Sequence, residues 1–348
     1  MIKNLFNKKI DAYLIESPKN RFYFTGFSAS WGYVLLHESE KILYVDPRYA
    51  QAAKESVKTF KVKCVSSKEC LPQITADLKE LGVKTLGYED TFISVASFKN
   101  LKASFKEFSL KPASEFIAQE RIIKNSIEID IMRAAQKLAE KAFNVVVDIC
   151  KPGVSERDIK TALIIECLRL GAEEMSFAPI VAFGENTSIP HHKPSTKKLE
   201  KNDVILIDFG VKLNGYCSDM TRTFCLGNPS EKMQHIYNTV LGAQKYVLQH
   251  LKSGLTCKEV DALAREYIKS NGYDKEFSHG LGHGIGLDIH EDPFVNMHRG
   301  DILLPGMVVT VEPGVYIEGI GGVRIEDMVV IKENGIDNLT TVSKEFIL

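Results

Sequence analysis

Carboxylates that end or interrupt apolar strand sequences are the feature that most restricts how this 348-residue chain can fold. In DVILIDFG, Asp208 follows four apolar residues, and Asp219 comes after an Asn-Gly turn of the kind found in hairpins. Glu312 follows the apolar strand of MVVTVEPG, and Glu326 lies inside the apolar strand of GGVRIEDMVVI. A buried carboxylate is costly unless it is paired, hydrogen-bonded or bound to a metal. The fold therefore has to bring these side chains to partners.

Each acid has a plainer interpretation when it is taken alone. Asp208 would cap a strand end, Asp219 would lie in a surface turn, and a single acid in a strand often faces solvent. Four such acids together with a histidine-rich stretch are poorly explained by solvation. Carboxylates and an imidazole together predict a two-metal site, in which bridging groups hold divalent ions about 3.5–4 Å apart. The hard oxygen ligands favour Mn²⁺ or Mg²⁺, and the imidazole leaves Co²⁺, Fe²⁺ and Zn²⁺ open.

The stretch HGLGHGIGLDIHEDP holds three histidines, and its glycines limit how they are used. His279 and His283 are four residues apart, as in a helical zinc pair, and His290 with Glu291 resembles the opening of H-E-x-x-H. The four glycines would cost a helix roughly 1 kcal/mol each relative to alanine. The residue four positions after His290 is Phe294. The stretch therefore predicts an open, glycine-bent backbone close to a metal centre.

The first 110 or so residues alternate short apolar strands with amphipathic helices, which predicts an α/β layer domain. Strands are expected at 11–16, 33–38, 41–46 and 85–90, and helices at 48–57 and 71–81.

The rest of the chain predicts long helices mixed with antiparallel strands. Asn125 and Glu128 form a capping-box pattern before one helix, and Ser155 caps a second helix that stops at Gly171. Further helices are expected at 230–252 and 257–270, and strands at 178–184, 203–210, 221–226, 307–311 and 324–332. The predicted class is α+β, with domains 1–122 and 123–348.

Composition excludes several classes of function. The net charge of −1 leaves no electrostatic footprint for nucleic acid or an anionic membrane. No apolar run approaches the ~20 residues that span a bilayer, and the N-terminus does not resemble a signal peptide. Seven scattered cysteines without C-x-x-C are typical of reduced, mostly buried thiols. We expect a cytoplasmic protein.

The ordered motifs DFG…GYCSDMTRTF, HGLGHGIGLDIHEDP, VTVEPGVY and GGVRIEDMV resemble the pita-bread metallopeptidases. That family includes methionine aminopeptidase, aminopeptidase P, prolidase and creatinase. RIIKNSIEIDIMRAAQ and IVAFGENTSIPHHKPS resemble its linker-helix and substrate-side motifs. IDAYLIESPKNRFYFTGF with ILYVDPRYAQAA resembles the creatinase-type N-terminal domain of its proline-specific members. The resemblance implies that a creatinase-type α/β domain precedes a pita-bread catalytic domain.

The resemblance also implies a dinuclear centre with Mn²⁺ as the favoured ion and Co²⁺, Zn²⁺ or Fe²⁺ as alternatives. Bridging by Asp219 and Glu326 is implied, with Asp208 on one ion and His283 and Glu312 on the other. Two such ions would lower the pKa of a bridging water to give hydroxide. Glu312 would accept its proton, and the hydroxide would attack the carbonyl before proline. The five implied ligands are Asp208, Asp219, His283, Glu312 and Glu326.

Three histidines are implied as proton donors and hydrogen-bond donors to the tetrahedral intermediate: His191, His279 and His290. In PHHKP the family histidine directly follows a proline, so His191 matches it. We interpret His192 as a surface residue.

Arg324, Tyr316 and Trp31 each have a functional and a structural interpretation. On a continuous strand, Arg324 shares a face with Glu326 and would orient the metal carboxylates or bind a substrate carboxylate. Alternatively, it forms a structural ion pair with Asp327 or Glu312. Tyr316 matches a family site tyrosine but as a lone residue is more often core. Trp31 would wall the partner's pocket in a homodimer, or simply pack locally.

The predicted function is an Xaa-Pro aminopeptidase that acts on short peptides with proline at the second position. A prolidase that cuts Xaa-Pro dipeptides is the first alternative, and a non-catalytic peptide-binding protein is the second. The N-terminal domain argues against methionine aminopeptidase. The complete ligand set argues against a creatinase-like enzyme, which does not use the metal site.

Overall fold

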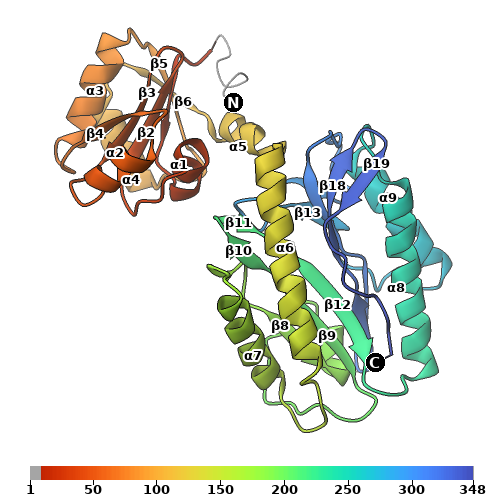
Figure 1. Cartoon of the computed structure of the whole chain (residues 1–348). Helices are drawn as coiled ribbons and strands as arrows, with labels where there is room; N and C mark the ends of the chain where they lie inside the picture. The colour runs from red at the N-terminus through yellow and green to blue at the C-terminus, as the bar shows by residue number, and fades with distance from the viewer. Residues whose placement is uncertain (1–8, 348) are drawn as a thin grey trace. The chain divides into compact units, whose positions relative to one another are not determined.

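The computed structural model describes residues 9–347, which divide into two compact units with the boundary between Arg121 and Ile122 (Figure 1). Each unit has hydrophobic clusters of its own. No helix in the described residues is long and apolar enough to cross a membrane. Cys64 is exposed and the other six cysteines are buried, as their scattered spacing predicts.

The first unit is built on a six-stranded mixed sheet with the order β4-β3-β2-β1-β5-β6. In β1, Ala12 and Leu14 enter one hydrophobic cluster while Tyr13 and Ile15 enter another. Both faces of the strand are therefore covered, which explains why its sequence is apolar throughout. The strands are β1 Ala12–Ile15, β2 Tyr33–His37, β3 Lys41–Val45, β4 Lys61–Cys64, β5 Thr85–Tyr88 and β6 Ser109–Pro112.

The expected alternation of strands and helices in this unit is confirmed, with more elements than the periodicity reveals. The additional ones are α1, β4, α4, β6 and α5, which are short or only weakly amphipathic. The helices are α1 Pro18–Thr25, α2 Ala50–Ser56, α3 Cys70–Glu80, α4 Val95–Ser104 and α5 Ser114–Ile122.

The second unit contains two halves, each with two helices and antiparallel strands around its own hydrophobic cluster. In the first half, α6 (Ser126–Val147) and α7 (Glu156–Arg169) lie with the sheet β12-β9-β8. In the second, α8 (Glu231–His250) and α9 (Cys257–Ser270) lie with the sheet β14-β13-β15-β18-β19 (Figure 1).

The strands of the second unit and its 3-10 helix η1 are all short. They are β7 Glu174–Met175, β8 Ile180–Phe183, η1 Gly184–Ser188, β9 Val204–Phe209, β10 Val211–Leu213, β11 Tyr216–Cys217, β12 Met220–Cys225, β13 Gly282–Gly284, β14 Glu291–Val295, β15 Val308–Val311, β16 Gly314–Ile317, β17 Gly321–Arg324, β18 Asp327–Lys332 and β19 Gly335–Asn338.

Helix capping follows the sequence signals closely. The capping box of Asn125 and Glu128 starts α6, and Ser155 caps α7 in a second capping box. These side chains satisfy backbone N–H groups that have no partner within the first helical turn.

The expectation of one continuous strand over 324–332 is wrong. β17 ends at Arg324 and pairs with β16, whereas β18 begins at Asp327 and pairs with β15. Between them, the Glu326 N–H donates to the Thr221 carbonyl at 3.1 Å. The chain therefore changes its strand-pairing partner at Glu326, and the strict alternation of side chains between two faces does not apply there.

Candidate metal centre

The antiparallel pair β9–β12 places the two aspartates on one side of the candidate centre. Asp208 lies in β9 opposite Thr221 of β12, and Asp219 directly precedes β12. Both aspartates are less than a tenth exposed, as expected for acids that follow apolar residues. The Asn-Gly turn joins β10 to β11, so it shapes the loop that brings the chain back to Asp219.

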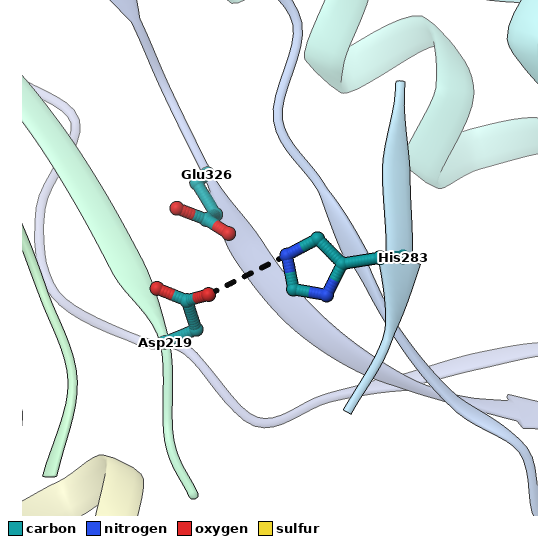
Figure 2. Close-up of side chains that lie close together, drawn as sticks. All are labelled: Asp219, His283 and Glu326. Atoms are coloured by element: carbon teal, nitrogen blue, oxygen red, sulfur yellow. Dashed lines mark ion pairs between the residues drawn. The ribbon is translucent and has the colours of Figure 1, made fainter. Parts of the chain in front are cut away.

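The second half of the unit supplies the other acids and the histidine. His283 lies in β13, Glu312 follows β15, and Glu326 lies between β17 and β18. The His283 Nε2 atom is 3.6 Å from Asp219 Oδ2 and 3.5 Å from Glu312 Oε1. Figure 2 shows Asp219, His283 and Glu326 turned toward one another. One possible ligand atom of each residue lies within 4.8 Å of the others.

Three acids of the candidate centre have a carboxylate oxygen that accepts no hydrogen bond from the described residues. Asp208 Oδ1, Asp219 Oδ1 and Glu326 Oε1 are buried and have no hydrogen-bond partner among the residues that the structure describes. Burial, reinforced by the neighbouring carboxylates, raises the pKa of Asp219 and of Glu326 well above the ordinary value. Burial also raises the pKa of Glu312 to about 8. Buried carboxylate oxygens without donors fit divalent cations, which would stabilise their charged forms.

His283 has the tautomer that a metal ligand needs. Its Nδ1 lies 3.0 Å from the Gly284 carbonyl oxygen, which only accepts, so Nδ1 carries the proton. The lone pair of Nε2 then faces the carboxylates of Asp219 and Glu312. Burial lowers the pKa of His283 to about 4, so the ring is neutral near pH 7. A neutral imidazole fixed through its other nitrogen is the usual form of a histidine ligand.

Arg324 and Thr221 hold the acids in place. An Arg324 guanidinium nitrogen donates to Asp208 Oδ2 at 2.5 Å, and its Nε donates to Thr221 Oγ1 at 3.2 Å. Thr221 Oγ1 in turn donates to Glu326 Oε2 at 2.7 Å. Thr221 was not expected from the sequence. The signal was the polar run T-R-T inside an otherwise apolar strand, where every side chain is buried.

The alternative interpretation of Arg324, a structural ion pair with Asp327 or Glu312, is wrong. Arg324 pairs with Asp208, whereas Asp327 accepts from Arg222 at 2.9 Å and from Lys344 at 2.5 Å. The break between β17 and β18 is the physical reason. Arg324 and Asp327 belong to different sheets, so their positions in sequence do not fix which partners they meet.

Tyr316 connects Arg324 to His279. The guanidinium of Arg324 donates to the Tyr316 hydroxyl at 2.7 Å, and that hydroxyl lies 3.0 Å from His279 Nε2. Because His279 Nδ1 lies 2.8 Å from the Gly280 carbonyl, Nε2 is left as the acceptor for the tyrosine proton. Burial lowers the pKa of His279 to about 4 and raises that of Tyr316 to about 12. Tyr316 is thus part of the polar cluster and not a plain core residue.

One cavity of about 950 Å³ is lined by the predicted site residues of this unit other than Tyr316. The ring of His290 packs edge-on against His283, with centroids 4.4 Å apart. The predicted residues that line the cavity are His191, Asp208, Asp219, His279, His283, His290, Glu312, Arg324 and Glu326.

Two further residues interpreted from the sequence, His192 and Trp31, are not predicted metal ligands or catalytic groups. The interpretation of His192 as a surface residue is wrong, because its side chain is 11% exposed and its Nε2 lies 2.8 Å from Glu156 Oε2. Trp31 belongs to the first unit, where it packs edge-to-face on Tyr33 with centroids 6.0 Å apart. A role for Trp31 beside a partner's cavity stays a prediction.

Comparisons with known proteins assign this fold, with its candidate metal centre, to a family of metal-dependent peptidases. Residues 130–333 match metallopeptidase family M24, and residues 2–123 match the Creatinase/Prolidase N-terminal domain. The chain belongs to metallopeptidase family M24.

Similar proteins cover nearly the whole chain. An Xaa-Pro dipeptidase of Pyrococcus furiosus is 39% identical over all of this chain and 98% of its own length. The structure of an Xaa-Pro dipeptidase from Bacillus anthracis is 37% identical, with a TM-score of 0.94 over 97% of this chain and 95% of that one. An X-Pro aminopeptidase from Thermotoga maritima is 35% identical, with a TM-score of 0.93 over 97% and 98%.

Proposed function

We propose that this chain is a two-metal peptidase that hydrolyses the Xaa-Pro bond of short peptides. The observation that carries the proposal is the set of buried, unpartnered oxygens of Asp208, Asp219 and Glu326. They lie in the same cavity as His283, whose Nε2 is ready to bind a cation. The proposed ligands are Asp208, Asp219, His283, Glu312 and Glu326, with Mn²⁺ as the favoured ion and Co²⁺, Zn²⁺ or Fe²⁺ as alternatives.

When bound, divalent ions would polarise a peptide carbonyl and acidify a water molecule. The residues of this chain would do the rest. Glu312 would accept the proton, because it lies at the cavity wall and the bound cations would keep its carboxylate ionised. His191 and His290 would donate hydrogen bonds to the charge that develops on the substrate. His279, whose Nδ1 proton faces the Gly280 carbonyl and whose Nε2 accepts from Tyr316, would instead hold Tyr316 in place. Arg324 would keep Asp208 fixed through its 2.5 Å contact.

The names of the similar proteins favour dipeptides over longer peptides. Two relatives that match over this whole chain, and two similar solved structures, are Xaa-Pro dipeptidases or prolidases, which favours the prolidase alternative over the aminopeptidase expected from sequence. The X-Pro aminopeptidase of Thermotoga maritima keeps an aminopeptidase as the second candidate. Both activities need the same chemistry at the same bond, so the metal centre alone does not separate them.

The first experiment removes the metal and restores it. Chelated protein should lose hydrolysis of Ala-Pro and regain it with Mn²⁺ or Co²⁺, because the ligands by themselves supply no comparable Lewis acid. Metal analysis should give two ions per chain, and fewer for Asp219→Asn. Full activity in the chelated protein, or in Asp219→Asn, would contradict the mechanism.

The second experiment compares Ala-Pro with Ala-Pro-Ala under the restored condition. Hydrolysis confined to the dipeptide identifies a prolidase, and hydrolysis of both identifies an aminopeptidase.

A homodimer in the cytoplasm belongs to the same proposal. If Trp31→Ala stays folded and leaves kcat/KM unchanged, Trp31 is not part of a partner's cavity.

A further inference from the structure

Glu156 is a fully buried carboxylate outside the metal centre, at the start of α7. It supports the loop that carries His191, because it binds several backbone and side-chain groups at the end of β8 and after it. Its oxygens accept five hydrogen bonds, at distances between 2.6 and 2.9 Å. The donors are Phe183 N, Asn186 Nδ2, His192 Nε2, Ser195 N and Ser195 Oγ.

His191 stands between two anchored neighbours in this loop. On one side, the His192 ring is bound to Glu156 at 2.8 Å. On the other side, the Pro190 carbonyl accepts from Arg324 at 3.4 Å, and Arg324 also holds Asp208. His191 itself is exposed and lines the cavity. Its backbone is therefore fixed from both sides while its ring stays available to a substrate.

The charge of Glu156 matches this role. Burial alone would raise its pKa, but hydrogen bonds from Asn186, Ser195 and His192 hold the pKa of the carboxyl below its ordinary value. An ionised carboxylate accepts at both oxygens, whereas a glutamine offers one oxygen and an NH₂ group. A glutamine at this position would set its NH₂ group against donors and leave some of them unpaired.

We propose that Glu156 is a positioning residue for Xaa-Pro hydrolysis, which sets the place of His191 in the cavity through His192 and Ser195. This inference rests on the proposed function, in which His191 donates a hydrogen bond or a proton to the reacting peptide. Displacement of a reacting group by about 1 Å can reduce a rate by about 100-fold.

The test is a double-mutant cycle on Ala-Pro hydrolysis with Mn²⁺-restored protein. His191→Ala should lower kcat about 100-fold, and Glu156→Gln about tenfold with KM little changed. If Glu156 acts through His191, the double variant should be no slower than His191→Ala alone, because coupled residues are not additive. Bound metal, measured on each variant, should stay at the wild-type level.

Glu140 provides the matched control. It is also a buried glutamate in this unit, and it accepts from the Thr341 hydroxyl at 2.7 Å and from Val342 N at 3.2 Å. Glu140→Gln removes a comparable set of hydrogen bonds away from the cavity lining. If Glu140→Gln lowers kcat at all, the double variant Glu140→Gln/His191→Ala should show the product of the two separate fold-losses, as independent residues do.

A second pair of variants covers the case in which Glu156→Gln does not fold. His192→Gln keeps an N–H donor for Glu156 and should lose less kcat than His192→Ala, at equal metal content. Equal losses in that pair, a multiplicative cycle for Glu156 and His191, or full activity of His191→Ala would each overturn the inference. A wild-type protein that cleaves no Xaa-Pro peptide would instead remove the proposed function, on which this inference rests.

Discussion

A single hydroxyl illustrates how much of the site depends on residues that touch no substrate. Thr221 Oγ1 donates to Glu326 at 2.7 Å and accepts from Arg324 Nε at 3.2 Å. Both partners are buried, so each would be left with an unsatisfied group if the hydroxyl were removed. The position of Glu326 is therefore set jointly by its own backbone and by Thr221.

Thr221→Val keeps the shape of the side chain and should weaken metal binding about 10- to 100-fold, the usual effect of losing a group that orients a ligand. Calorimetric titration of metal-stripped protein with Mn²⁺ measures this. Thr239→Val is the matched control, since Thr239 is buried and bonds only the His235 carbonyl of its own helix among the described contacts. An unchanged Kd in Thr221→Val would show that Glu326 needs no such support.

At this scale, the sequence predicts acids better than it predicts their partners. Asp208 and Glu326 are recognisable because a charge within an apolar strand needs an explanation. Thr221 is not, because its partner Glu326 lies 105 positions further along the chain. His192 is a similar case: Glu156, 36 positions earlier, reaches it only after the fold forms.

Among the elements, β13 shows most clearly why the histidine stretch is rich in glycine. A Cβ at Gly282 would lie 2.1 Å from the Thr310 carbonyl oxygen of β15. Because Thr310 is in a buried strand, that oxygen cannot move aside cheaply. The glycine thus permits close packing of the strand that carries His283.

Gly282→Ala should therefore shift β13, displace His283 and abolish tight Mn²⁺ binding, with a lower Tm. Gly300→Ala is the control, because a Cβ there meets no atom of the described chain within 4 Å. Thermal melts and metal analysis of both variants decide the matter. Normal metal content in Gly282→Ala would mean that the strands can separate without moving the ligand.

Helices of this chain are predictable where a cap is followed by an amphipathic pattern, as at Asn125, or by a glycine stop, as between Ser155 and Gly171. The region 324–332 is not, because each of its two halves is apolar enough for a strand. What breaks it is the pairing of the Glu326 backbone with Thr221 across the unit, and no local pattern encodes that contact.

At the scale of the whole molecule, the buried acids make stability depend on pH and metal together. The pKa of Glu312 is raised from 4.5 to about 8. Between these two pH values the folded protein retains a proton on Glu312 that the unfolded chain has lost. Stability is therefore lost as pH rises toward 8. His279 and His283, with pKa values of about 4, act in the opposite direction, but only below about pH 6.5.

Between pH 6.5 and 8, only the first of these effects remains. The Tm of metal-stripped protein should fall across this window, with a loss of up to roughly 2 kcal/mol for each retained proton. Bound cations stabilise the ionised carboxylates, so the Mn²⁺-restored protein should show a flatter profile. Melts of both forms at several pH values test this, and a Tm of the stripped form that rises with pH would contradict it.

The architecture and family of the molecule are largely readable from sequence, because ordered motifs cover nearly all of it. The choice between dipeptides and longer peptides is not. That preference depends on how far the cavity extends beyond the scissile bond, and the ligand motifs are the same for both activities. Phe294 and Lys193 line the cavity, yet neither belongs to a metal-ligand motif.

The division of the second unit into two halves also bears on how an ion would leave it. Asp208 and Asp219 come from one half, and His283, Glu312 and Glu326 from the other, each built on its own cluster of apolar side chains. An ion held by both sets joins distant parts of the chain and disfavours partly opened states. An ion can leave through the cavity that its ligands line, and its loss then frees the halves to part. Hydrogen exchange of the chelated protein becomes a measure of that opening, read without any substrate.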